Sequence, residues 1–146
     1  MSAAYYDANY LFKLQCQEHG TAEVLAHAAT VQVLYSALHA RAEFTSAAFR
    51  KVREGTASQK DFRLFLAQMH ADTATGNLRF LPLTDTIIDR IEAVFATAPA
   101  TTYLRAADAL HLATAAENGF TEIHSNDRHL LAAAPLFGLV GVNVIL

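Results

Sequence analysis

The sequence predicts one three-layer α/β/α domain, spanning residues 1–146, with a central and mainly parallel sheet. Short β-rich runs alternate with helical segments, which is typical of a parallel sheet covered on both faces. No linker, low-complexity tract or internal repeat divides the chain, and 146 residues suit a single domain with a real core. Ligands of such sheets bind outside the carboxyl ends of the strands, so polar residues there are the first site candidates.

Changes in the spacing of apolar residues along the chain predict the strands and helices in order. Strands are predicted at residues 3–7, 31–35, 78–83, 121–124 and 140–145. Helices are predicted at 8–17, 21–29, 37–54, 104–118 and 127–134, and two more begin after the N-caps Ser58 and Thr84. The helix after Thr84 ends before Pro99, and Gly119 closes the helix at 104–118.

Two apolar stripes on these helices predict buried or partner-binding faces. The inward face of the 37–54 helix is predicted from residues spaced three and four apart: Leu38, Ala42, Thr45, Phe49 and Val52. The helix after Ser58 carries a second stripe, Phe62, Phe65, Leu66 and Met69, which is typical of a core or a partner groove.

The composition predicts that part of the apolar surface is covered by a partner. Hydrophobic residues make up 53% of the chain and charged residues only 17%, against about 25% in typical domains. The net charge of −3 gives no general attraction to nucleic acid. Five basic residues nevertheless gather between positions 50 and 63, as a solvated face or a phosphate-steering patch: Arg50, Lys51, Arg53, Lys60 and Arg63.

Other sequence signals narrow the class of protein. Cys16 is the only cysteine, which excludes an internal disulfide and a cysteine-rich zinc site. No signal peptide or membrane-length apolar run is recognised, so we expect a soluble cytoplasmic protein with no membrane association. No nucleophile elbow, Walker loop or dinucleotide fingerprint is present.

Asp108 is the strongest single site candidate. In a helix from Leu104, it shares a face with apolar residues, including Leu112. A buried, unpaired carboxylate costs several kcal/mol, so a cation is expected beside it. Arg105, three residues earlier, could supply that charge, and a metal ion is the alternative.

Three further acids occupy plausible positions around the same site. Asp7 and Asp127 each stand where a predicted strand ends and a helix begins, so each could be a helix cap or a ligand. Glu43 lies on a polar line with His39 that could face solvent or edge a cleft. Asn9 could hold a metal-bound water or close a local turn. Clustered carboxylates suit hard cations, Mg²⁺ or Mn²⁺, which phosphodiester hydrolysis uses.

Histidines are expected to play structural roles. His111 lies one helical turn after Asp108. The simpler interpretation is a packed histidine that is hydrogen-bonded to the backbone, and the alternative is a histidine that contacts substrate or water. His39, one turn before Glu43, has the same two interpretations. His124 and His129 lack the spacing of a zinc pair.

Four segments together resemble a known family. They are the strand end Tyr6-Asp7-Ala8-Asn9-Tyr10-Leu11, the helix from Leu38 through Glu43 to Gly55, the helix Leu104-Arg105-Ala106-Ala107-Asp108-Ala109-Leu110-His111, and Ser125-Asn126-Asp127-Arg128-His129-Leu130. In this order they resemble the PIN-domain ribonucleases, and among them the VapC-type toxins of toxin–antitoxin pairs. Asn126 stands where the family commonly has a smaller residue.

The resemblance implies a PIN-like fold and a specific role for each acid. Asp7, Glu43 and Asp108 would be metal ligands, and Asp127 a ligand directly or through water. Ser125 would be a supporting hydroxyl, and Arg105 would orient Asp108 or hold an RNA phosphate.

The resemblance also implies a function. The chain would be a Mg²⁺- or Mn²⁺-dependent endoribonuclease that acts on RNA, forms a homodimer and is held inactive by a cognate antitoxin. Two alternatives stay open: a non-catalytic binding or assembly module, and an α/β metal-dependent phosphohydrolase of small phosphate esters. The latter usually has an Asp-x-Asp pair, whereas Asn9 follows Asp7 here.

Overall fold

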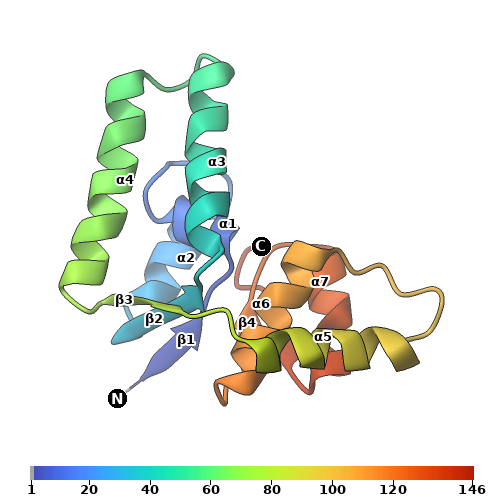
Figure 1. Cartoon of the computed structure of the whole chain (residues 1–146). Helices are drawn as coiled ribbons and strands as arrows, with labels where there is room; N and C mark the ends of the chain where they lie inside the picture. Colours follow the sequence, from blue (N-terminus) through green and yellow to red (C-terminus); the bar gives the residue numbers. More distant parts are fainter. Residues whose placement is uncertain (1) are drawn as a thin grey trace.

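The computed structural model describes residues 2–146, which form parallel strands with helices on both sides (Figure 1). The strands are β1 (Ala3–Tyr5), β2 (Val33–Ala37), β3 (Leu78–Leu81), β4 (Glu122–His124) and β5 (Val140–Val142). The helices are α1 (Ala8–Lys13), α2 (Thr21–Ala28), α3 (Ala40–Arg53), α4 (Gln59–Ala74), α5 (Asp85–Thr97), α6 (Ala106–Glu117) and α7 (Arg128–Ala133), followed by the 3-10 turn η1 (Ala134–Phe137).

The strands form two parallel ladders that meet along one seam. β1, β2 and β3 make one ladder in that order, and β4 and β5 make the other. In the described part of the chain, one parallel bridge, between Tyr6 and His124, joins β1 to β4. The Asp7 amide adds a hydrogen bond to the His124 carbonyl, at 3.1 Å. The mainly parallel sheet predicted from the sequence is thus confirmed.

Neighbouring residues of β1 point into two different cores, because side chains alternate along a strand. Tyr6 packs in a core with α1, α2, α3 and α4, whereas Tyr5 packs on the opposite face with α5, α6, α7 and η1. Tyr5 and Tyr6 are both completely buried. The sheet therefore lies between two helical layers, which confirms the three-layer architecture.

α3 and α4 extend side by side away from the sheet as a helical hairpin (Figure 1). The face of α3 predicted to point inward is wrong: Leu38 and Phe49 are 44% and 46% exposed, and the buried residues of the helix are Ala40, Phe44 and Ala48. Apolar residues lie on both sides of this helix, so their spacing alone could not identify the side that packs on the sheet. The exposed side lines a groove against α4.

Local signals account for most helix boundaries. Ser58 caps α4 in a capping box with Asp61, and the Thr84 hydroxyl accepts a hydrogen bond from the Ile87 amide at the start of α5. α1 is shorter than predicted and ends at Lys13. Within residues 2–146, no helix has both the length and the apolar character needed to cross a bilayer.

Candidate functional site

All four predicted acids line one small cavity at the carboxyl ends of β1 and β4. The cavity measures about 80 Å³ and is lined by Asp7, Ala8, Asn9, Glu43, Arg105, Asp108, His111 and Asp127. The acids come from four separate segments: the end of β1, the first turns of α3 and α6, and the residue before α7. The fold thus brings together carboxylates that the sequence keeps far apart.

Asp7 is both a helix cap and a wall of the cavity. Its Oδ1 accepts a hydrogen bond from the Tyr10 amide, 2.9 Å away, which caps α1. Its Oδ2 accepts a 2.6 Å hydrogen bond from the Ser125 hydroxyl, and that hydroxyl in turn accepts one from the Asp127 amide at 2.9 Å. Ser125 therefore connects the first acidic segment to the fourth across the seam between β1 and β4.

Burial raises the pKa of Asp7 above its ordinary value of 3.8, and the charge of His111 and the hydrogen bonds from Ser125 and Tyr10 oppose this only in part. The charged form is therefore unfavourable in the metal-free protein. A group whose pKa is higher in the folded state than in the unfolded state holds its proton more tightly when folded. Its contribution to the free energy of unfolding is complete below the unfolded-state pKa and is lost as the pH rises through the folded-state pKa.

We expect this pKa to make the metal-free protein lose stability as the pH rises from 3.8, the ordinary value, through the raised folded-state pKa, and Asp7→Asn to remove that component. Urea unfolding of chelator-treated protein across this range measures it. The control is Asp61→Asn, because hydrogen bonds with Ser58 lower the pKa of the exposed Asp61 and its contribution changes only under acid conditions. Equal pH slopes for wild type and Asp7→Asn would contradict the prediction.

The two carboxylate oxygens of Asp127 have different partners: one caps a helix and the other faces Arg105. Oδ1 accepts hydrogen bonds from the His129 and Leu130 amides, at 2.8 and 3.2 Å, and so caps α7. Oδ2 faces the guanidinium of Arg105 at 2.8 Å. Asp127 is therefore a helix cap and also lines the cavity, so the two interpretations that the sequence presents as alternatives are compatible.

Asp108 is buried in the first turn of α6, as its apolar helix face predicted. Its Oδ2 lies 3.1 Å from Nε of Arg105, and the same guanidinium reaches Asp127. Arg105 is thus the cation that holds these two carboxylates together in the metal-free protein. Its side chain is 57% exposed, so it can leave without unfolding α6.

Removing the side chain of Arg105 should lower the stability of the metal-free protein and increase its stabilisation by a metal ion. We expect Arg105→Ala to lower the Tm of the metal-free protein, because Asp108 and Asp127 lose their common cation. We also expect a larger Tm increase on adding Mn²⁺, since the ion no longer competes with the guanidinium. Thermal unfolding with and without Mn²⁺ measures both effects.

Arg128→Ala is the matched control, because Arg128 is exposed and begins the neighbouring helix α7. It should leave both Tm values close to those of wild type. A smaller Mn²⁺ shift in Arg105→Ala would show instead that Arg105 positions Asp108 for the ion.

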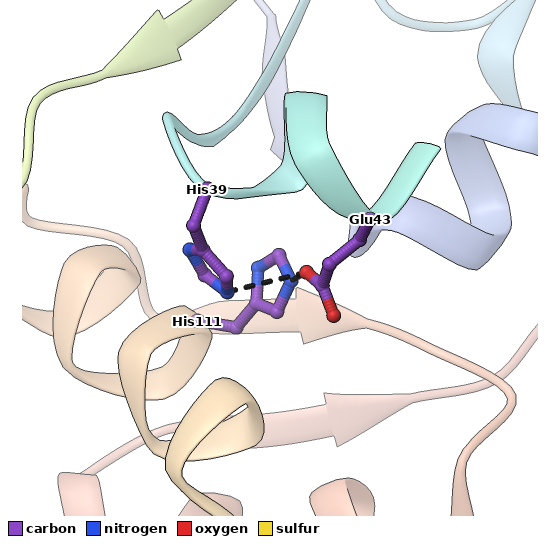
Figure 2. A group of neighbouring side chains, drawn as sticks. All are labelled: His39, Glu43 and His111. Atoms are coloured by element: carbon purple, nitrogen blue, oxygen red, sulfur yellow. Dashed lines mark hydrogen bonds and ion pairs between the residues drawn. The ribbon is translucent and has the colours of Figure 1, made fainter. Parts of the chain in front are cut away.

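Glu43 is held by two histidines at the edge of the cavity (Figure 2). Its Oε1 lies 2.6 Å from Nε2 of His111 and 3.2 Å from Nε2 of His39. A carboxylate only accepts hydrogen bonds, so His111 donates to it, whereas Nε2 of His39 donates to the Ala107 carbonyl, 3.1 Å away, and lies beside Glu43. Burial alone would raise the pKa of Glu43, but the neighbouring imidazoles of His111 and His39 outweigh burial and lower it to about 2.

The environment of His111 differs from the one expected from sequence. It is buried as predicted, but its partners are side chains rather than backbone: Glu43 on one nitrogen and the Tyr5 hydroxyl, at 2.8 Å, on the other. No local pattern signals these contacts, since Tyr5 and Glu43 lie on other elements. The sequence does place His39 and Glu43 one helical turn apart, which is the only local sign of the cluster.

The donor set of the cavity fits a hard divalent cation. Asp7, Asp108, Asp127 and Glu43 offer carboxylate oxygens, the ligands that Mg²⁺ and Mn²⁺ prefer. Asn9 adds an exposed amide at the rim of the same cavity.

Comparison with known proteins gives a family and a fold. The sequence model of the PIN domain matches residues 4–135. Among solved structures, the chain is similar to one in the VapBC2 complex from Rickettsia felis, which is bound to a DNA fragment from their promoter. The TM-score is 0.66 with 10% sequence identity, and the match covers 97% of this chain and 98% of that one. No curated protein sequence matches this chain.

Proposed function

This chain belongs to the PIN domain family, and we propose that it is a Mg²⁺- or Mn²⁺-dependent endoribonuclease, the toxin of a VapBC-type toxin–antitoxin pair. The observation that carries the proposal is the convergence of Asp7, Glu43, Asp108 and Asp127 on one cavity. PIN domains are generally nucleases that use divalent metals, and similarity to a VapBC2 chain supports the toxin assignment.

Each residue of the cavity would have a different role in hydrolysis. Asp7, Asp108, Asp127 and Glu43 would hold the cation, and Ser125 fixes the orientation of Asp7 through its 2.6 Å hydrogen bond. When bound, a hard divalent cation supplies the charge that acidifies water and neutralises the leaving oxygen of a phosphodiester. The exposed guanidinium of Arg105, which pairs with Asp108 and Asp127 in the metal-free protein, would bind an RNA phosphate.

RNA would reach the acids through a shallow depression beside them. It measures about 430 Å³ and includes Asn9, Glu43, Ser46 and Arg50 in its lining. Glu43 and Asn9 line the acidic cavity as well, so the two spaces adjoin at these residues. Arg50 supplies positive charge next to carboxylates that would otherwise repel a phosphate, which favours a phosphate-steering role for at least this member of the basic cluster.

The groove between α3 and α4 is the surface we propose for the antitoxin. It measures about 610 Å³, and its floor includes Leu38, Phe49, Phe62, Leu66 and Met69. An amphipathic helix or apolar segment of the antitoxin would cover these side chains. Its edge residue Ser46 also borders the depression beside Glu43, so an antitoxin seated here would lie next to the RNA path.

A second copy of the chain would cover apolar residues on the other side of the molecule. Phe95, Tyr103 and Leu136 are 47%, 55% and 38% exposed around the end of α5 and η1. Exposed apolar residues of this size are typical of interfaces, and they support the homodimer expected for this type of toxin. We place the dimer, with its RNA substrate, in the cytoplasm.

The proposal is tested by comparing wild type with Asp7→Asn in bacterial cells and on purified RNA. Asparagine can still cap α1 through its carbonyl oxygen, so the variant should fold. We expect growth arrest and Mn²⁺-dependent RNA cleavage in wild type, and loss of both in Asp7→Asn. RNA left intact by wild type under every divalent ion would instead support a non-catalytic binding module.

A further inference from the structure

We propose that His39, Glu43 and His111 form a binding site for a borderline divalent cation, with Zn²⁺ as its best ligand, beside the all-carboxylate part of the cavity. Figure 2 shows the three side chains pointing toward one another, two from the start of α3 and one from α6. One ligand atom from each, an imidazole nitrogen or a carboxylate oxygen, lies within 4.8 Å of the other two. This inference does not require the chain to be a nuclease.

The distances are close to those of a metal site. In a tetrahedral zinc site with bonds of about 2.1 Å, neighbouring ligand atoms are roughly 3.4 Å apart. Glu43 Oε1 is 3.2 Å from Nε2 of His39, which is near that separation, and 2.6 Å from Nε2 of His111, so the second distance would lengthen by about 0.8 Å on metal binding. The centroids of the two imidazoles are 4.3 Å apart.

The ligand atoms of these three residues favour a different ion from the one favoured by the carboxylates in the rest of the cavity. Two imidazole nitrogens and one carboxylate suit Zn²⁺ and its neighbours in the first transition row, whereas carboxylates alone suit Mg²⁺. In the metal-free protein Nε2 of His39 and Nε2 of His111 lie close to the same oxygen of Glu43, and an ion among the three atoms would bind that oxygen and both nitrogens at once.

Neighbouring groups orient the imidazoles for this role. Metal-binding histidines usually make a hydrogen bond with their other ring nitrogen, and Nδ1 of His111 lies 2.8 Å from the Tyr5 hydroxyl. A hydroxyl both donates and accepts, so Tyr5 can accommodate the tautomer that leaves Nε2 free for a metal. On binding a metal, His39 would give up a 3.1 Å hydrogen bond to the Ala107 carbonyl, and its side chain is 21% exposed.

An ion can reach this position from solvent. Glu43 and His111 both line the acidic cavity, and Glu43 also borders the open depression beside it. Three protein ligands leave a fourth position for water. Since Glu43 would serve both ions, zinc and the proposed Mg²⁺ centre would compete for it; this consequence alone rests on the proposed function.

The test is Zn²⁺ binding by metal-free protein, measured by competition with a chromophoric chelator and without RNA. We expect one Zn²⁺ per chain and an affinity at least about tenfold weaker in His39→Gln. Co²⁺ used as a probe should give the visible absorption of low-coordinate, imidazole-bound Co²⁺ in wild type and not in His39→Gln. His39 is chosen because it is half-buried at the start of α3, whereas the more deeply buried His111 also supports the core.

Two control variants separate this site from others. His70→Gln removes an exposed histidine of α4 and should keep wild-type Zn²⁺ affinity, whereas Asp127→Asn removes a carboxylate from the other side of the cavity and should weaken Zn²⁺ binding less than His39→Gln does. Equal affinity in wild type and His39→Gln would overturn the proposal. So would Zn²⁺ binding lost in Asp127→Asn but kept in His39→Gln. Because RNA is absent from these measurements, failure here leaves the nuclease proposal standing, and failure of cleavage leaves the zinc site standing.

Discussion

Asp108→Asn is expected to lower the rate of divalent-metal-dependent RNA cleavage by about a hundredfold or more. Asp108 is buried at the start of α6 and contributes a carboxylate to the cavity shared with Asp7 and Asp127. Asparagine has nearly the same shape but no negative charge, so it keeps the packing and weakens cation binding. The rate is measured on a defined RNA at saturating Mn²⁺, and again at rising Mn²⁺ to separate weak binding from slow chemistry.

The matched control is Asp89→Asn, because Asp89 is an exposed acid of α5, away from the cavity. It should cleave at the wild-type rate. Far-UV circular dichroism and Tm establish that Asp108→Asn folds. Undiminished cleavage by a folded Asp108→Asn would show that Asp108 is not part of the catalytic centre. Cleavage that needs no divalent ion would show that the mechanism does not use a metal.

Leu112→Ala is expected to destabilise the fold by about 2–5 kcal/mol, which is the largest stability effect we predict. Leu112 is completely buried in the core formed by α5, α6, α7 and η1, one helical turn after Asp108. Removing its side chain leaves a cavity that rigid neighbours such as Ile123 and Phe137 cannot fill. Urea unfolding of metal-free protein measures the loss.

Leu64→Ala makes the same chemical change where the side chain is 56% exposed, on α4. It should alter the free energy of unfolding by less than about 0.5 kcal/mol. A loss of similar size in both variants would mean that the effect does not come from packing in the core. Helix propensity would not explain such a loss, because alanine is a better helix former than leucine.

The sequence was most informative where a residue conflicted with its surroundings. Asp108 lies on an apolar helix face, and that conflict alone predicted a cation beside it; the structure places Arg105 there. Asp7 and Asp127 were predicted from strand ends, and the parallel sheet brings strand ends to one edge. At both residues the capping and site interpretations are compatible, because the two carboxylate oxygens serve different partners.

Periodicity failed where a helix is apolar on more than one side. Along the predicted 37–54 helix, which contains α3, both the row through Leu38 and Phe49 and the row through Phe44 and Ala48 fit a buried face. Only packing on the sheet decides between them, and packing depends on residues far away in the chain. The same limit hid the contact of Glu43 with His111, which lies 68 positions later and is brought near by α6.

The seam between β1 and β4 gives the acidic cavity a mechanical role. Asp7 extends from one ladder and Asp127 from the other, and the ladders meet at the bridge of Tyr6 with His124. A cation held by both carboxylates would act as a cross-link between the two halves of the sheet. Its loss would lower the cost of local opening at this seam and so speed hydrogen exchange of the Asp7 amide, while amides deep within either core kept their protection.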